Sequence, residues 1–163
     1  MTIDEITDFV GALGGVLAVT PGPGDGSPEI SWGDTFFYHS PGGAVPTAAR
    51  PFATIVTKDY PGEASSRLDR PDAFRVNVAA GREEFIRRTG RAPRDPATDE
   101  DPGATDTVMA HPVYGPLGWL AVVNPGRRTD VALRELLRHA HHLARARDER
   151  RTGPVTGDRG PQG

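Results

Sequence analysis

The sequence predicts an α+β protein built on a single antiparallel sheet of about five to seven strands, with an N-terminal and a long C-terminal helix packed mainly on one face. Short apolar segments alternate with turns rich in Gly and Pro through most of the chain. Apolar residues recur at helical spacing mainly near the two ends. Because links of about two to five residues leave no room for a crossover helix, neighbouring strands should pair antiparallel.

The first segment has the pattern of a capped helix. Thr2 and Glu5 fit a capping box, and apolar residues follow at helical spacing over residues 3–13. Gly14 and Gly15 then predict the end of this helix. The strands expected after it are residues 16–19, a hairpin formed by 29–32 and 35–39, and residues 52–58.

A further strand is expected at residues 74–78. Its apolar residues alternate with Arg75 and Asn77, which predicts one buried and one solvated face. The other elements expected in this part are a helical turn at 65–68, a short helix over 82–89 with Phe85 and Ile86 facing inward, and a mobile polar loop over 90–106.

The C-terminal part should contain two strands and the longest helix. Residues 108–126 have the pattern of a strand, a turn rich in Pro and Gly, and a second strand. Thr129 should cap a helix over residues 130–150, which carries a stripe of leucine and alanine. We therefore expect one domain over residues 1–150 and a disordered tail rich in Gly, Pro and Arg over 151–163.

Composition argues against several classes of protein. The chain contains no cysteine, which excludes a disulfide framework, thiolate catalysis and a thiolate metal site. The net charge is −3 and basic residues are interleaved with acids, so nucleic acid is not an expected partner. No apolar run approaches the ~20 residues that span a bilayer. The first 49 residues lack Lys and Arg, so no secretory leader is expected and a cytoplasmic location is predicted.

Two patterns resemble metal sites, and neither fits one. At about 100° per residue, His139, His141 and His142 point in different directions around a helix and are interpreted as a solvated face. The acidic residues of 95–106 lack the closing Glu of a calcium loop. We therefore predict no metal and no cofactor.

The strongest candidate site residues lie in the strand–turn–strand segment near the C-terminus. His111 has a side chain whose ordinary pKa suits proton transfer near neutrality. Tyr114 and Trp119 would supply flat apolar surfaces with hydrogen-bonding tips. Asn124 follows the second strand. For each residue, an ordinary role in the core or a turn is the competing interpretation.

A second group of candidates is Lys58, Asp59 and Tyr60, at the end of a predicted strand, where functional side chains often lie. Lys58 is the only lysine among 19 basic residues. Either codon bias has replaced lysine wherever any cation serves, or an ammonium group is required at this position. The predicted ligand-binding residues are thus Lys58, Asp59, Tyr60, His111, Tyr114, Trp119 and Asn124, and the catalytic candidates are His111, Lys58 and Tyr114.

Three segments, residues 51–62, 66–78 and 111–125, resemble the domain-of-unknown-function 6194 family of actinobacterial proteins. The resemblance runs from residue 2 to about residue 147. The resemblance implies a single-domain cytosolic protein, and it does not identify any catalytic residues. More loosely, the strand–turn–strand–Asn-Pro–helix ending is similar to small MmcQ/YjbR-like proteins, an analogy of fold alone.

Three functional hypotheses follow. The first is a non-enzymatic module that binds a small molecule or a protein partner against the sheet near Tyr114 and Trp119. The second is an enzyme that uses His111 as acid and base, with Lys58 holding an anionic substrate or polarising a carbonyl. The third is a weak nucleic-acid binder, by analogy of fold. A membrane partner is not expected, and whether the protein is an enzyme stays open.

Overall fold

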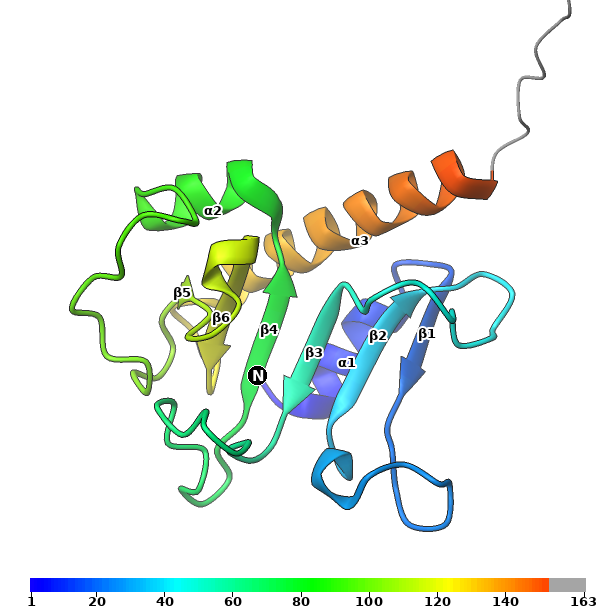
Figure 1. The fold of residues 1–163 in the computed structure, drawn as a ribbon, viewed down its shortest axis with the longest axis horizontal. Coiled ribbons are helices and arrows are strands. Elements are labelled where there is room, and N and C mark those ends of the chain that lie inside the picture. Colours follow the sequence, from blue (N-terminus) through cyan, green and yellow to red (C-terminus); the bar gives the residue numbers. More distant parts are fainter. Residues whose placement is uncertain (153–163) are drawn as a thin grey trace, which may run out of the picture.

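The computed structural model describes residues 1–152 and contains one six-stranded antiparallel sheet in the order β1-β2-β3-β4-β6-β5 (Figure 1). The strands are β1 (Val16–Val19), β2 (Thr35–His39), β3 (Ala53–Val56), β4 (Arg75–Ala79), β5 (Met109–Ala110) and β6 (Trp119–Val123). The helices are α1 (Ile3–Gly11), α2 (Gly81–Thr89) and α3 (Asp130–Thr152), with 3₁₀ turns η1 (Glu29–Ser31) and η2 (Gly115–Leu117). The predicted α+β fold is confirmed.

Helices α1 and α3 lie on the same face of the sheet, behind it in Figure 1. The apolar positions of the strands point toward them, and Ile6 of α1 and Leu133 of α3 are fully buried against this face. The sheet residues of the same core include Phe37, Ile55, Val76, Val78, Leu120 and Val122. Burial of these apolar side chains holds the helical layer on the sheet.

The strand at 74–78 was expected to have one solvated face, and this prediction is wrong. Arg75 and Asn77 point away from the helices but are only 4% and 3% exposed. The segments at 57–74 and 111–118 lie over this half of the sheet, and their side chains contact Arg75. The alternation of side chains along a strand shows which residues share a face of the sheet. It does not show whether that face is exposed to water or covered by a loop.

Some local predictions are also wrong. The segment 29–32 is the 3₁₀ turn η1 and forms no hairpin, because β2 pairs with β1 and β3 instead. Residues 65–68 form a turn, where Arg67 has a positive φ of 52°, which interrupts a helix. Ile86 is 37% exposed, because Phe85 occupies the inward position of α2 and the next residue lies about 100° around the helix.

The ends of the terminal helices are well defined. Thr2 caps α1 as predicted and accepts a hydrogen bond from the backbone N–H of Glu5 at 3.1 Å. At the start of α3, Thr129 occupies the predicted position directly before Asp130, its carbonyl accepts the backbone N–H of Leu133 at 2.7 Å, and its hydroxyl donates to Asp106. Asp106 also accepts the backbone N–H groups of Gly126, Arg128 and Thr129. A carboxylate from the preceding loop therefore fixes the turn that leads into this helix.

Other expectations concern α3 and the tail. His141 was expected on a solvated face, but it is 8% exposed and its Nε2 lies 2.8 Å from the carbonyl oxygen of Gly14. The helix ends at Thr152, slightly beyond the predicted end. The rest of the predicted tail, from residue 153, lies outside the described residues. Within residues 1–152, no helix has the length and apolar character needed to cross a membrane.

Candidate functional site

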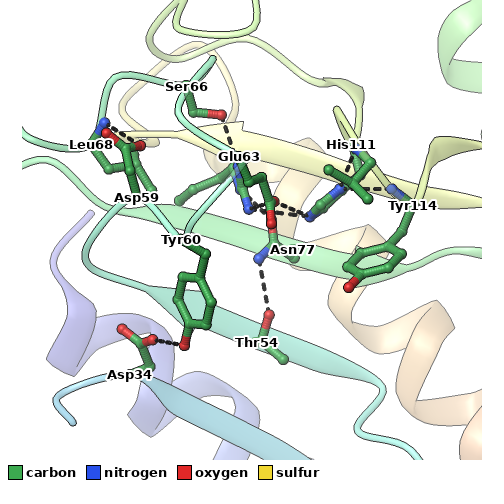
Figure 2. Close-up of polar contacts among 12 residues, drawn as sticks. Asp34, Thr54, Asp59, Tyr60, Glu63, Ser66, Leu68, Asn77, His111 and Tyr114 are labelled. Carbon is green, nitrogen blue, oxygen red and sulfur yellow. Dashed lines mark hydrogen bonds and ion pairs between the residues drawn. The ribbon is translucent and has the colours of Figure 1, made fainter. Parts of the chain in front are cut away.

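A cavity of about 440 Å³ lies on the face of the sheet opposite α1 and α3. Its floor comes from adjacent strands, with Thr54 on β3 and Asn77 opposite it on β4. Tyr60 and Tyr114 flank this floor from the two covering segments (Figure 2). The further lining residues are Phe36, Arg50, Pro51, Val56, Glu63, Arg75, His111, Leu117 and Trp119.

Arg75 is the centre of a buried polar network. Its Nε donates to the amide oxygen of Asn77 at 2.7 Å, and its Nη1 donates to Ser66 at 2.8 Å. Its Nη2 donates to the Glu63 carboxylate at 2.7 Å. A buried charge is tolerated only with such partners, so these bonds hold the 57–74 segment onto β4.

His111 is oriented by its own backbone turn. Its Nδ1 accepts hydrogen bonds from the backbone N–H groups of Val113 and Tyr114, both at 3.0 Å. A neutral imidazole whose Nδ1 accepts carries its proton on Nε2. That Nε2 lies 3.2 Å from Nη2 of Arg75 and 3.7 Å from the Glu63 carboxylate. Nε2 therefore lies beside both a guanidinium group and a carboxylate.

The surroundings of His111 keep its ring neutral. Burial and, second, the positive charge of Arg75 lower the pKa of His111 from 6.5 to about 3. The proton-transfer role expected from its ordinary pKa therefore lacks support in the electrostatics of the site. In the neutral form, the ring acts as a fixed hydrogen-bonding group and as a flat surface. Its centroid lies 4.9 Å from that of Tyr114.

The floor of the cavity offers a directed hydroxyl group. The side-chain N–H of Asn77 donates to the Thr54 hydroxyl oxygen at 3.0 Å. Because that oxygen accepts, the hydroxyl proton is available to a third group. Among the described residues, this hydroxyl has no hydrogen-bond acceptor. The floor can therefore donate one hydrogen bond to a ligand.

Lys58 lies outside this cavity, in a neighbouring cluster around Asp34. Its ammonium donates to the Trp32 carbonyl at 2.7 Å and to the buried Asp34 carboxylate at 3.0 Å. The Tyr60 hydroxyl donates to the other oxygen of Asp34. Burial and this hydrogen bond raise the pKa of Tyr60. Both side chains are thus tied to Asp34, and only Tyr60 lines the cavity.

The remaining predicted site residues have local structural contacts. Asp59 accepts the backbone N–H of Leu68 at 2.9 Å. The side-chain oxygen of Asn124, which has a positive φ of 44°, accepts the backbone N–H of Phe74 at 3.0 Å. Neither residue lines the cavity. The predicted residues that the structure brings together there are Tyr60, His111, Tyr114 and Trp119.

Sequence reasoning missed the polar floor and its supports. Thr54, Glu63, Arg75 and Asn77 line the cavity and were not among the candidates. The available signal was the occurrence of Arg and Asn at alternate positions of an otherwise apolar strand. That signal was interpreted as a solvated face. Within residues 1–152, no group of three His, Cys, Asp or Glu side chains is arranged to hold a metal ion.

The fold and the site define an α+β protein whose single sheet is covered by helices on one face and bears a loop-walled cavity on the other. The chain belongs to the family of unknown function DUF6194, whose model matches residues 1–153. A search of curated proteins and a search of solved structures each found no match. The family predicted from three segments is confirmed.

Proposed function

We propose that this protein is a non-enzymatic binding module that holds a small molecule in the cavity above Thr54 and Asn77. The observation that carries the proposal is a buried polar floor beneath an aromatic rim. The cavity volume of about 440 Å³ falls within the range typical of small-molecule sites. Such sites combine mostly apolar walls with a few polar groups in defined orientations, as this cavity does.

The cavity walls favour a ligand with a flat portion. Tyr114 is 47% exposed at the rim, and its ring centroid lies 6.5 Å from that of Trp119. Aromatic rings supply a large contact area with little loss of side-chain entropy. The Thr54 hydroxyl below would donate to a polar edge of the ligand, while Glu63 and Arg75 neutralise one another beside it.

Geometry favours binding over the enzymatic alternative. That alternative requires Lys58 and His111 to approach one cleft, and Lys58 does not line the cavity. Both nitrogens of the His111 ring already face protein groups. The ammonium of Lys58 is likewise bound, to Trp32 and Asp34. We therefore do not propose a catalytic role for this pair.

The test is a thermal-shift screen of the full chain against a library of aromatic metabolites and cofactors, followed by calorimetry on the compounds that bind. Tyr114→Ala should weaken binding at least tenfold, because it removes an aromatic wall, a loss of about 1.4 kcal/mol. Tyr38→Ala, at a tyrosine outside the cavity, is the matched control and should bind normally. The proposal fails if no compound binds, or if both variants bind as the unmodified chain does.

A further inference from the structure

A second hollow, of about 460 Å³, adjoins the cavity. It lies between the link that precedes β3, the start of α2 and the C-terminal part of α3. The two hollows share four lining residues: Arg50, Pro51, Leu117 and Trp119. Because they share this wall, one extended ligand can contact both.

The second hollow is positively charged. Arg50 enters it from the link before β3, and Arg147 and Arg150 enter it from α3. Residues three apart on a helix lie on the same side, so the two helical guanidinium groups are neighbours. No acidic side chain lines the hollow, and none of the three arginines forms an ion pair within residues 1–152.

Three other arginines of α3 have partners. Arg134 pairs with Asp130 at 2.7 Å, and Arg145 pairs with Glu149 at 2.9 Å. Arg138 lies over the ring of Phe9. The positive charge in the hollow is therefore a local excess, on a chain whose net charge is −3. Three guanidinium groups that line one hollow without an acidic side chain favour an anion between them.

We infer that the ligand of the cavity carries an anionic group, a phosphate or a carboxylate, that binds Arg50, Arg147 and Arg150 in the adjoining hollow. This inference rests on the proposed function and specifies its ligand class. A guanidinium group matches both anions because its planar fork donates two parallel hydrogen bonds. The flat part of the ligand would lie in the cavity, and its anionic part would pass Trp119 to reach the arginines.

The first experiment uses the position of Trp119 between the two hollows. The chain has two tryptophans, and Trp32 lines neither hollow, so its indole N–H signal is an internal control. NMR titrations of the full chain with inorganic pyrophosphate and with citrate, at constant ionic strength, should shift the Trp119 signal alone. The anion that acts at the lower concentration identifies phosphate or carboxylate as the preferred group.

Arginine variants make this experiment specific. The triple substitution R50Q/R147Q/R150Q should weaken the response at least tenfold. Arg145→Gln, which removes a guanidinium group of the same helix outside the hollow, should leave it unchanged. The inference is overturned if neither anion moves the Trp119 signal, or if the triple variant responds as the unmodified chain does.

A second arm separates this inference from the proposed function, using calorimetry with AMP and adenosine. AMP should bind at least tenfold more tightly, and the triple variant should abolish that preference. If both compounds bind equally and Tyr114→Ala weakens both, the binding function stands and the anionic group is refuted. If pyrophosphate binds but neither compound responds to Tyr114→Ala, the cavity function fails, and the inferred ligand class fails with it.

Discussion

At the scale of single residues, His111 shows how local geometry sets the chemistry of a side chain. Two backbone N–H groups bind its Nδ1, and a buried guanidinium group lies beside its Nε2. Both features disfavour the imidazolium form. The ring is therefore a neutral, oriented part of the cavity wall. Histidine is often chosen as a candidate catalytic residue because its ordinary pKa lies near neutrality, but here the surroundings prevent that titration.

The depressed pKa of His111 predicts a loss of stability in acid. Its native pKa of about 3 lies below the ordinary value of 6.5, so the unfolded chain binds more protons between these values. The stabilising contribution is complete above pH 6.5 and is lost as the pH falls toward 3. Between pH 7 and pH 5, the free energy of unfolding should fall by about 2 kcal/mol more in the unmodified chain than in His111→Gln.

Urea unfolding of both proteins at the two pH values measures this difference. The comparison with His111→Gln removes the contributions of the other histidines, which are common to both proteins. Equal pH dependence in the two proteins would show that His111 is not held neutral by its surroundings.

At the scale of elements, the start of α3 depends on a residue distant from it in sequence. Asp106 accepts three backbone N–H groups and one hydroxyl group there. Burial raises the pKa of Asp106, but the bonds from Thr129, Gly126 and Arg128 outweigh it and lower the pKa to about 2. The carboxylate is therefore charged at neutral pH, where it accepts these four hydrogen bonds.

Asp106→Ala should lower the free energy of unfolding by about 1–2 kcal/mol at pH 7, because the N–H groups of the turn before α3 lose their acceptor. Asp99→Ala, an exposed position in the same loop, is the control and should change stability by less than about 0.5 kcal/mol. The native pKa of Asp106 is depressed, so its contribution is complete above pH 3.8 and disappears as the pH falls through about 2. Similar losses in the two variants would contradict the role of Asp106 in holding this turn.

At the scale of the whole molecule, two different layers cover the sheet. Helices cover one face through apolar contacts, and loops cover the other through the polar network around Arg75. The cavity lies between these loops and the strands that carry Thr54 and Asn77. The buried pair of Arg75 and Glu63 connects the sheet to the loop layer.

Glu63→Leu should lower the free energy of unfolding by about 3 kcal/mol, because it leaves the guanidinium group of Arg75 buried without its carboxylate. Adding Arg75→Met should restore part of that loss. Asp101→Ala breaks the exposed pair with Arg67 and should cost less than about 1 kcal/mol. Chemical denaturation of the four proteins tests this. A double variant less stable than Glu63→Leu would contradict the explanation.

Much of the fold could be predicted because local patterns encode it. Apolar periodicity located α1, α3 and most strands, and short links implied antiparallel pairing. The predicted hairpin at 29–39 failed because the choice of strand partner depends on contacts between distant segments. The predicted Lys58 site is not in the cavity for a similar reason, since Asp34, 24 residues away in sequence, binds its ammonium.

The sequence by itself determined the fold class, the apolar face of the sheet and the aromatic turn with His111, Tyr114 and Trp119, because each depends on residues close together in the chain. Tertiary structure alone decided that Arg75 and Asn77 are covered, that His111 is neutral and that arginines from two elements share one hollow. The physical reason is that burial and electrostatics depend on neighbours in space, and here those neighbours are separated by tens of residues.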